Sequence, residues 1–211
     1  MFIGFYNLAN SVTLLGLAFA VMSCMAAISG NSEASIITAT LLFLGSGLCD
    51  MFDGRIARGS GSRTRKEKLF GIQIDTVCDM VSFGVTPVVI AYCAGYDSVF
   101  HMVIYIVYAM CGAIRLAYFN TQAVEDTPDL NMKFFTGVPI PFCCLVLPPL
   151  MLIMKLCENP MTLWLSVLFA AMYLLMGILF IINVKIKKLN NAQAIVLIIA
   201  ELACVTTLLL V

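Results

Sequence analysis

Charge is what this sequence has least of. Only 11% of its 211 residues are Asp, Glu, Lys or Arg, whereas soluble domains average about 25%. The 12 basic and 12 acidic side chains balance, so the chain lacks the basic excess typical of a nucleic-acid-binding protein. With 62% hydrophobic residues, it also lacks the polar surface that a water-exposed domain needs. We therefore predict a polytopic membrane protein with no nucleic-acid partner.

Paired Cys and His residues are also missing. The chain has one histidine, His101, and its nine cysteines are scattered through apolar runs without a CxxC pair. Structural zinc sites and disulfide frameworks both depend on paired spacings of these residues. We therefore expect neither, because isolated thiols in apolar runs behave as small hydrophobic side chains.

Long apolar runs are what the sequence has in abundance. A membrane-spanning helix needs roughly 20 apolar residues, and seven stretches of the chain approach or exceed that length. They lie at 11–29, 34–52, 72–95, 98–119, 138–157, 161–183 and 192–211. We therefore predict an all-α transmembrane bundle that forms a single membrane-embedded domain over residues 1–211.

The few charges are distributed unevenly among the connections. Short cytoplasmic loops carry an excess of Lys and Arg. All basic residues except Lys155 lie in or beside the connections that follow the second, fourth and sixth stretches, whereas Glu33, Asp97 and Glu158 lie in the others. We expect the N-terminus and the basic connections to face the cytoplasm. The basic residues are Arg55, Arg58, Arg63, Arg65, Lys66, Lys68, Arg115, Lys133, Lys185, Lys187 and Lys188.

Four aspartates interrupt the apolar pattern at the cytoplasmic ends of the second and third stretches. An Asp at the centre of a span costs about 2.5–3.5 kcal/mol on insertion scales, so a group of them suggests a function. Asp50 and Asp53 are three residues apart and Asp75 and Asp79 four apart, so each pair lies on one helix face. Because one loop joins the two helices, we expect the pairs to face each other.

Such a group of carboxylates requires positive charge nearby. Hard oxygen ligands favour magnesium, manganese or calcium over zinc. Two divalent cations sharing carboxylates form an arrangement typical of phosphoryl transfer. Gly54, Ala57 and Gly71 leave room beside the aspartates, and the Arg58 guanidinium could bind a phosphate. The pattern therefore predicts a metal-dependent phosphoryl-transfer site.

The same residues match a known signature. Residues 50–58 read D-M-F-D-G-R-I-A-R and residues 71–79 read G-I-Q-I-D-T-V-C-D. They resemble the D-x-x-D-G-x-x-A-R and G-x-x-x-D-x-x-x-D halves of the CDP-alcohol phosphotransferase family motif at every fixed position. The spacer between the two halves is longer than is usual in the family, and we expect its residues 59–70 to lengthen a cytoplasmic loop.

The resemblance implies a fold and a site. The family core has six helices, to which the last apolar stretch would add a seventh span. Asp50, Asp53, Asp75 and Asp79 would hold two divalent cations, Mg or Mn, and Asp79 would also act as general base. The N-S-V-T stretch at residues 10–13 is similar to the opening of the family's first span. The residues implied to bind CDP-diacylglycerol are Asn10, Thr13, Gly54, Ala57, Arg58 and Gly71.

Three further stretches indicate the acceptor. Residues 75–87, 114–120 and 134–141 are similar to members of the family that use serine. The resemblance thus implies transfer of the phosphatidyl group of CDP-diacylglycerol to the L-serine hydroxyl, with release of CMP. The alternative role of Arg115 and Lys133 is to anchor the chain at the membrane interface. The candidate serine-binding residues are Ser82, Thr86, Arg115, Asn120 and Lys133.

Other acceptors and another class of function remain open. Glycerol phosphate, inositol phosphate or choline could use the same site, although a phosphorylated acceptor calls for more arginines beside it. A small cation transporter would more often hold its carboxylates near the midplane, within broken or repeated helices, and no repeat is visible here. We also expect a homodimer in the bilayer, with Gly112 as a point of close helix contact.

Overall fold

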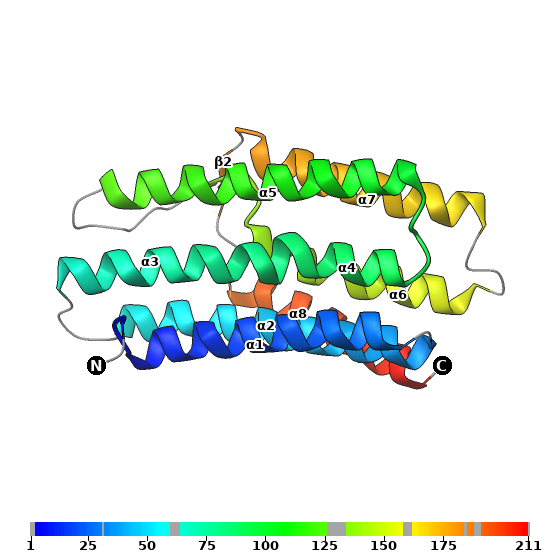
Figure 1. Ribbon diagram of the computed structural model, residues 1–211, viewed down its shortest axis with the longest axis horizontal. Helices are drawn as coiled ribbons and strands as arrows, with labels where there is room; N and C mark the ends of the chain where they lie inside the picture. The colour runs from blue at the N-terminus through cyan, green and yellow to red at the C-terminus, as the bar shows by residue number, and fades with distance from the viewer. Residues whose placement is uncertain are drawn as a thin grey trace.

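The computed structural model is an elongated helical bundle (Figure 1). It describes residues 3–30, 32–59, 64–125, 134–157, 162–183, 185–187 and 191–210. Each of the seven predicted spans corresponds to one helical segment, which confirms the all-α fold. The segments are α1 (Leu8–Ser29), α2 (Glu33–Gly59), α3 (Arg65–Asp79) running through the π-helical turn η1 (Met80–Val85) into α4 (Thr86–Cys93), α5 (Val99–Glu125), the 3₁₀ turn η2 (Ile140–Leu145) leading to α6 (Leu147–Leu156), α7 (Leu163–Ile181) and α8 (Asn191–Leu210).

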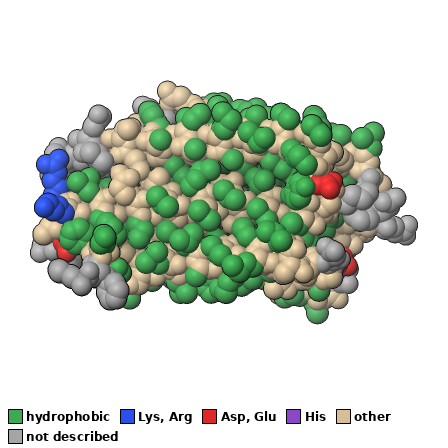
Figure 2. Space-filling view, viewed as in Figure 1, with side chains coloured by type: hydrophobic (Ala, Val, Ile, Leu, Met, Phe, Trp, Pro, Cys, Tyr) green, Lys and Arg blue, Asp and Glu red, His purple; other side chains and the backbone are tan. Residues whose placement is uncertain are grey.

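The helices have the length and composition of membrane spans. Within the described residues, five are long and apolar enough to cross a bilayer: α1, α2, the continuous segment α3–η1–α4, α5 and α7. The segments Ile140–Leu156 and Ile199–Leu210 are apolar but shorter. Hydrophobic side chains cover most of the face shown in Figure 2. In water such a surface would be unstable, whereas in a bilayer it faces lipid, so the chain is an integral membrane protein.

The connection between α2 and α3 is shorter than the sequence suggested. The expected loop over residues 59–70 is wrong from Arg65 onwards, because α3 begins there. A capping box starts this helix: the Thr64 hydroxyl accepts from the Glu67 amide at 3.3 Å, and the Glu67 carboxylate accepts from the Thr64 amide at 2.7 Å. Residues 65–70 of the spacer therefore extend α3 instead of a loop.

A small sheet joins two connections that lie far apart in sequence. Strand β1 (Phe134–Thr136) pairs antiparallel with β2 (Lys185–Lys187), with Phe135 opposite Ile186. Gly137 follows β1 with a φ of +72°, and the Val138 amide donates to the Leu179 carbonyl of α7 at 3.1 Å. The hydrophobic pattern gave no indication of this sheet. It holds the entry to α6 beside the end of α7.

The two ends of the bundle differ in charge. The Lys and Arg side chains visible in Figure 2 gather at the end where α3 begins, which we call the basic end, whereas acidic side chains appear at both ends. Asp79 precedes Cys93, the last residue of α4, by 14 residues, or about 21 Å of helix at 1.5 Å per residue. Asp79 is equally far from Arg65, where α3 begins, so it lies midway along the continuous helix. Asp75 lies one turn closer to the basic end.

Candidate active site

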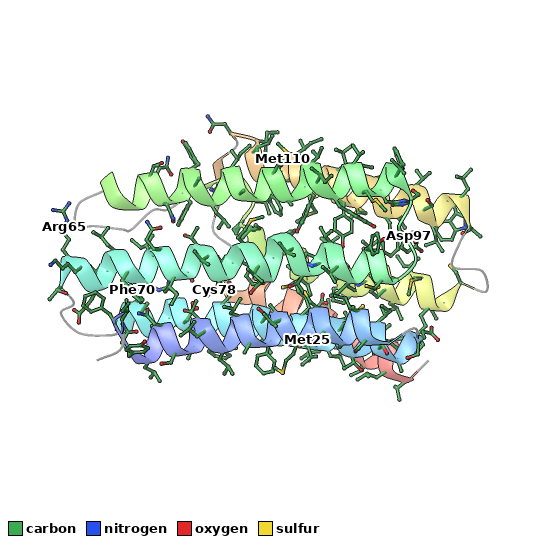
Figure 3. The ribbon with its side chains drawn as sticks, in the orientation of Figure 1. Met25, Arg65, Phe70, Cys78, Asp97 and Met110 are labelled. Carbon is green, nitrogen blue, oxygen red and sulfur yellow. The ribbon has the colours of Figure 1, made fainter. Side chains whose placement is uncertain are left out.

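The structure brings three of the four motif aspartates together. Asp50 comes from α2, and Asp75 and Asp79 come from α3. One carboxylate oxygen from each of the three lies within 4.8 Å of the others, and all three side chains are partly buried. This confirms that the two aspartate pairs face each other. In Figure 3, Arg65, Phe70 and Cys78 mark the course of α3 from the basic end towards this group.

Asp53 lies one turn after Asp50 on α2 and is hydrogen-bonded to α1. Its side chain is only 5% exposed, and its Oδ2 accepts a hydrogen bond from the Thr13 hydroxyl at 2.6 Å. Such a short bond to a carboxylate is charge-assisted. It fixes the orientation of Asp53 from a different helix, so three helices together hold the four aspartates.

The donor set of this group fits divalent cations. Within the described part of the chain, no Lys or Arg side chain pairs with Asp50, Asp75 or Asp79. Carboxylates this close repel one another unless a positive charge lies between them. Oxygen donors alone, with no thiolate or imidazole among them, are the ligands of Mg²⁺ or Mn²⁺. The three aspartates could hold such a metal ion.

The small motif residues lie where helices or side chains approach closely. A Cβ on Gly54 would lie 3.7 Å from a terminal nitrogen of Arg58, whose exposed guanidinium turns back along α2. A Cβ on Gly71 would lie 3.5 Å from Oδ1 of Asn10, at the contact between α3 and α1. Ala57 lies on α2, one turn after Asp53, and is partly buried. These residues thus surround the aspartates on the side of the basic end.

Two of the predicted serine-binding residues lie on α5 and make specific contacts. Oδ1 of Asn120 accepts from the Thr76 hydroxyl at 2.9 Å, which places Asn120 beside the residue that follows Asp75. Arg115 is 6% exposed, and its Nε donates to the Val138 carbonyl at 3.2 Å. The structure therefore joins Asn120 to α3 at Thr76 and anchors Arg115 against the chain that enters η2.

The other serine-binding candidates have different surroundings. Ser82 and Thr86 are 3% and 0% exposed, and the Thr86 hydroxyl donates to the Val81 carbonyl at 2.9 Å. Both lie within the bundle on the membrane side of Asp79. Lys133 lies outside the described residues.

Sequence reasoning missed the π-helical turn that follows Asp79. The pattern of residues 72–95 predicts one continuous span, and the span is indeed continuous, but residues 80–85 form hydrogen bonds of π type. π turns inside helices are rare and frequent at functional sites. The available signal was Pro87, which cannot donate an amide hydrogen bond inside the helix. The contact between Thr76 of α3 and Asn120 of α5 had no sequence signal either.

Comparisons with known proteins gave matches over the part of the chain that contains the aspartates. Residues 6–181 match the family model described as CDP-alcohol phosphatidyltransferase. A Methanocaldococcus jannaschii protein named CDP-diacylglycerol–serine O-phosphatidyltransferase is 30% identical over 185 residues, which cover 88% of this chain and 76% of that protein. A Helicobacter pylori protein of the same name is 29% identical over 193 residues, covering 89% of this chain and 75% of that protein.

A yeast relative matches a shorter part. The Saccharomyces cerevisiae protein, again named CDP-diacylglycerol–serine O-phosphatidyltransferase, is 31% identical over 142 residues, or 64% of this chain. The match spans about half of the yeast protein's length. No solved structure gave a significant match. The family model covers six of the seven helical segments and the whole aspartate motif, and the chain therefore belongs to the CDP-alcohol phosphatidyltransferase family.

Proposed function

We propose that this protein transfers the phosphatidyl group of CDP-diacylglycerol to the hydroxyl of L-serine, giving phosphatidylserine and CMP. The observation that carries the reaction class is the convergence of one carboxylate oxygen each from Asp50, Asp75 and Asp79 within 4.8 Å of one another. The choice of serine is supported by the names of the relatives, which are about 30% identical to this chain.

All four aspartates contribute to metal binding. Asp50, Asp53, Asp75 and Asp79 would hold two divalent cations, with Asp53 oriented by Thr13. When bound, such cations supply the positive charge that neutralises phosphate oxygens during transfer. Gly54, Ala57, Gly71 and Asn10 would contact the nucleotide of CDP-diacylglycerol, and Arg58 offers its guanidinium to a phosphate.

Asp79 takes the proton of the serine hydroxyl as a general base. The serine oxygen then forms a bond to the phosphorus next to the lipid, while the bond from that phosphorus to the bridging oxygen of the pyrophosphate breaks. The bridging oxygen and its electron pair leave with CMP. The partly buried position of Asp79 limits the access of water, which would otherwise compete with serine as the attacking group.

Serine recognition requires groups that bind a carboxylate and an ammonium. Arg115 and Asn120, both on α5, are the candidates that the structure places towards α3 and the entry to η2. With the basic end facing the cytoplasm, serine and CMP exchange with water on that side while the acyl chains stay in lipid. We also propose that the protein acts as a homodimer.

The test is CMP release by purified protein in detergent with CDP-diacylglycerol. L-serine, glycerol phosphate, inositol phosphate, choline or no acceptor is added, each with Mn²⁺, with Mg²⁺ or with chelator. We expect release that requires both serine and metal. Release with a different acceptor would overturn the serine assignment and keep the metal site. Serine-dependent release that persists under chelator would overturn the role of the aspartates as metal ligands.

A further inference from the structure

The helix that carries Asp75 and Asp79 changes its hydrogen-bonding pattern directly after Asp79. In the turn η1 the Thr86 amide donates to the Val81 carbonyl, five residues back, where an α-helix would use residue 82. A wider turn of this kind rotates the helix before it relative to the helix after it. The buried side chains of Ile90 and Ala91 fix α4 in the core. The turn therefore determines the direction in which α3 presents its aspartates.

Pro87 accounts for the presence of the wide turn. In an α-helix the Phe83 carbonyl would accept from the amide of residue 87, and proline has no amide hydrogen. The proline ring also clashes with the carbonyl four residues earlier, which is again that of Phe83. Phe83 is 0% exposed, so water cannot take the place of the amide that residue 87 does not offer.

Tyr108 of α5 is a donor to that carbonyl. Its hydroxyl donates to the Phe83 carbonyl at 2.7 Å, and the Cys143 thiol of η2 adds a weaker contact to the same oxygen at 3.7 Å. Tyr108 is 1% exposed. Pro87, Tyr108 and Cys143 also line one small cavity of about 10 Å³, so the three groups converge at this point.

The ring of Tyr108 is held in turn by α7. Its centroid lies 5.2 Å from that of Tyr173 and 5.4 Å from that of Phe180. These tilted and edge-on contacts are favourable geometries for aromatic pairs and leave the ring few alternative positions. A packed aromatic cluster therefore directs the Tyr108 hydroxyl at the π turn. The segments η1, α5 and η2 meet at the Phe83 carbonyl.

We propose that Tyr108 is a positioning residue for Asp79: its hydroxyl locks the π turn and so fixes the angle at which α3 presents its carboxylates. The inference rests on the proposed function, in which those carboxylates hold divalent cations. It assigns to α5 and α7, which contribute none of the aspartates, a direct influence on the geometry of the metal site.

The test is the affinity of the purified protein in detergent for Mn²⁺ alone, measured from the paramagnetic resonance signal of the free ion. We expect Tyr108→Phe to weaken Mn²⁺ binding by about tenfold, as the loss of a residue that orients metal ligands typically does. Tyr105→Phe is the matched control. The Tyr105 hydroxyl also donates to a buried carbonyl, that of Tyr96 at 3.1 Å, and its ring also contacts Tyr173, but it does not touch η1.

A second variant separates positioning from stability. Pro87→Ala restores an amide that can bond to the Phe83 carbonyl and lets the π turn relax to an α-helix. We expect this variant to unfold at the same temperature as the unsubstituted protein or higher, and yet to bind Mn²⁺ more weakly. A residue that only stabilised the fold would show the opposite combination. Pro87→Ala also provides the test if Tyr108→Phe does not fold.

The outcomes distinguish this inference from the function on which it rests. Unsubstituted protein that fails to bind Mn²⁺ overturns the metal site itself. Unsubstituted protein that binds Mn²⁺, together with folded Tyr108→Phe or Pro87→Ala of equal affinity, overturns the role of Tyr108 and leaves the proposed reaction intact. Weaker binding by Tyr108→Phe and unchanged binding by Tyr105→Phe supports both.

Discussion

Replacing Thr13 by valine tests whether α1 orients the metal ligands. The substitution keeps the shape of the side chain and removes the hydroxyl that donates to Asp53 at 2.6 Å. A hydrogen bond to a charged group contributes about 1.5–3 kcal/mol. Because Asp53 is 5% exposed and Thr13 is 8% exposed, water is poorly placed to replace the lost donor, and we expect most of that contribution to be lost.

The expected effect is on the metal requirement. At about 1.4 kcal/mol for each factor of ten, the loss corresponds to about a 10- to 100-fold change in an equilibrium constant. The same range is typical for removing the partner of a metal ligand. We therefore expect Thr13→Val to raise the Mn²⁺ concentration needed for half-maximal CMP release by that factor. The maximal rate at saturating Mn²⁺ should fall much less.

Thr40→Val is the matched control for this experiment. Thr40 is fully buried on α2, and its hydroxyl donates to the Ile36 carbonyl of the same helix at 2.8 Å. The chemical change is the same, but no aspartate loses a donor. Suppose that Thr13→Val folds and needs the same Mn²⁺ concentration for half-maximal CMP release as Thr40→Val and the unsubstituted protein. The hydrogen bond from Thr13 then has no part in organising the site.

Three other predictions concern the base, the metal and the fold. Asp79→Asn should abolish CMP release while CDP-diacylglycerol binding stays detectable, since an amide cannot accept the serine proton; near-normal turnover would remove Asp79 as the base. Chelator should stop CMP release, and added Mn²⁺ or Mg²⁺ should restore it; activity that stays lost after metal is returned would point to unfolding instead. Gly137→Ala should lower the unfolding midpoint, because its φ of +72° costs a side-chain-bearing residue about 1–2 kcal/mol and the new Cβ would lie 2.9 Å from the Phe180 carbonyl oxygen. Gly59→Ala is the control. A Cβ on Gly59 would meet no atom of the described residues within 4 Å, so the midpoint should stay unchanged.

The sequence predicted the helices well, because in a membrane protein an apolar run of sufficient length has few alternatives. It did not predict where the helices end in water. Residues 65–68 are all charged, and their helical state depends on the capping box at Thr64, a local signal that hydropathy overlooks. The sheet between β1 and β2 was also unpredictable, since it joins segments whose proximity depends on the packing of α5 and α7.

The site was predictable to the extent that its residues share a helix face. The spacing within each aspartate pair, and the single loop between the two helices, sufficed to place Asp50 opposite Asp75 and Asp79. Contacts between helices that are distant in sequence were not predictable. The bond from Tyr108 to the Phe83 carbonyl spans 25 residues, and only the register of α5 against η1 determines it.

The location of Pro87 has a consequence for how the protein is made. Chains are synthesised from the N-terminus, and early segments can associate before later ones exist. The four aspartates all lie within residues 50–79, so they enter the membrane with α1 to α3, before the ribosome has completed α5. At that stage the Phe83 carbonyl still lacks the Tyr108 hydroxyl. A nascent chain that ends after α4 thus carries every proposed metal ligand but lacks the contact that sets their angle, and it acquires that contact only when α5 arrives.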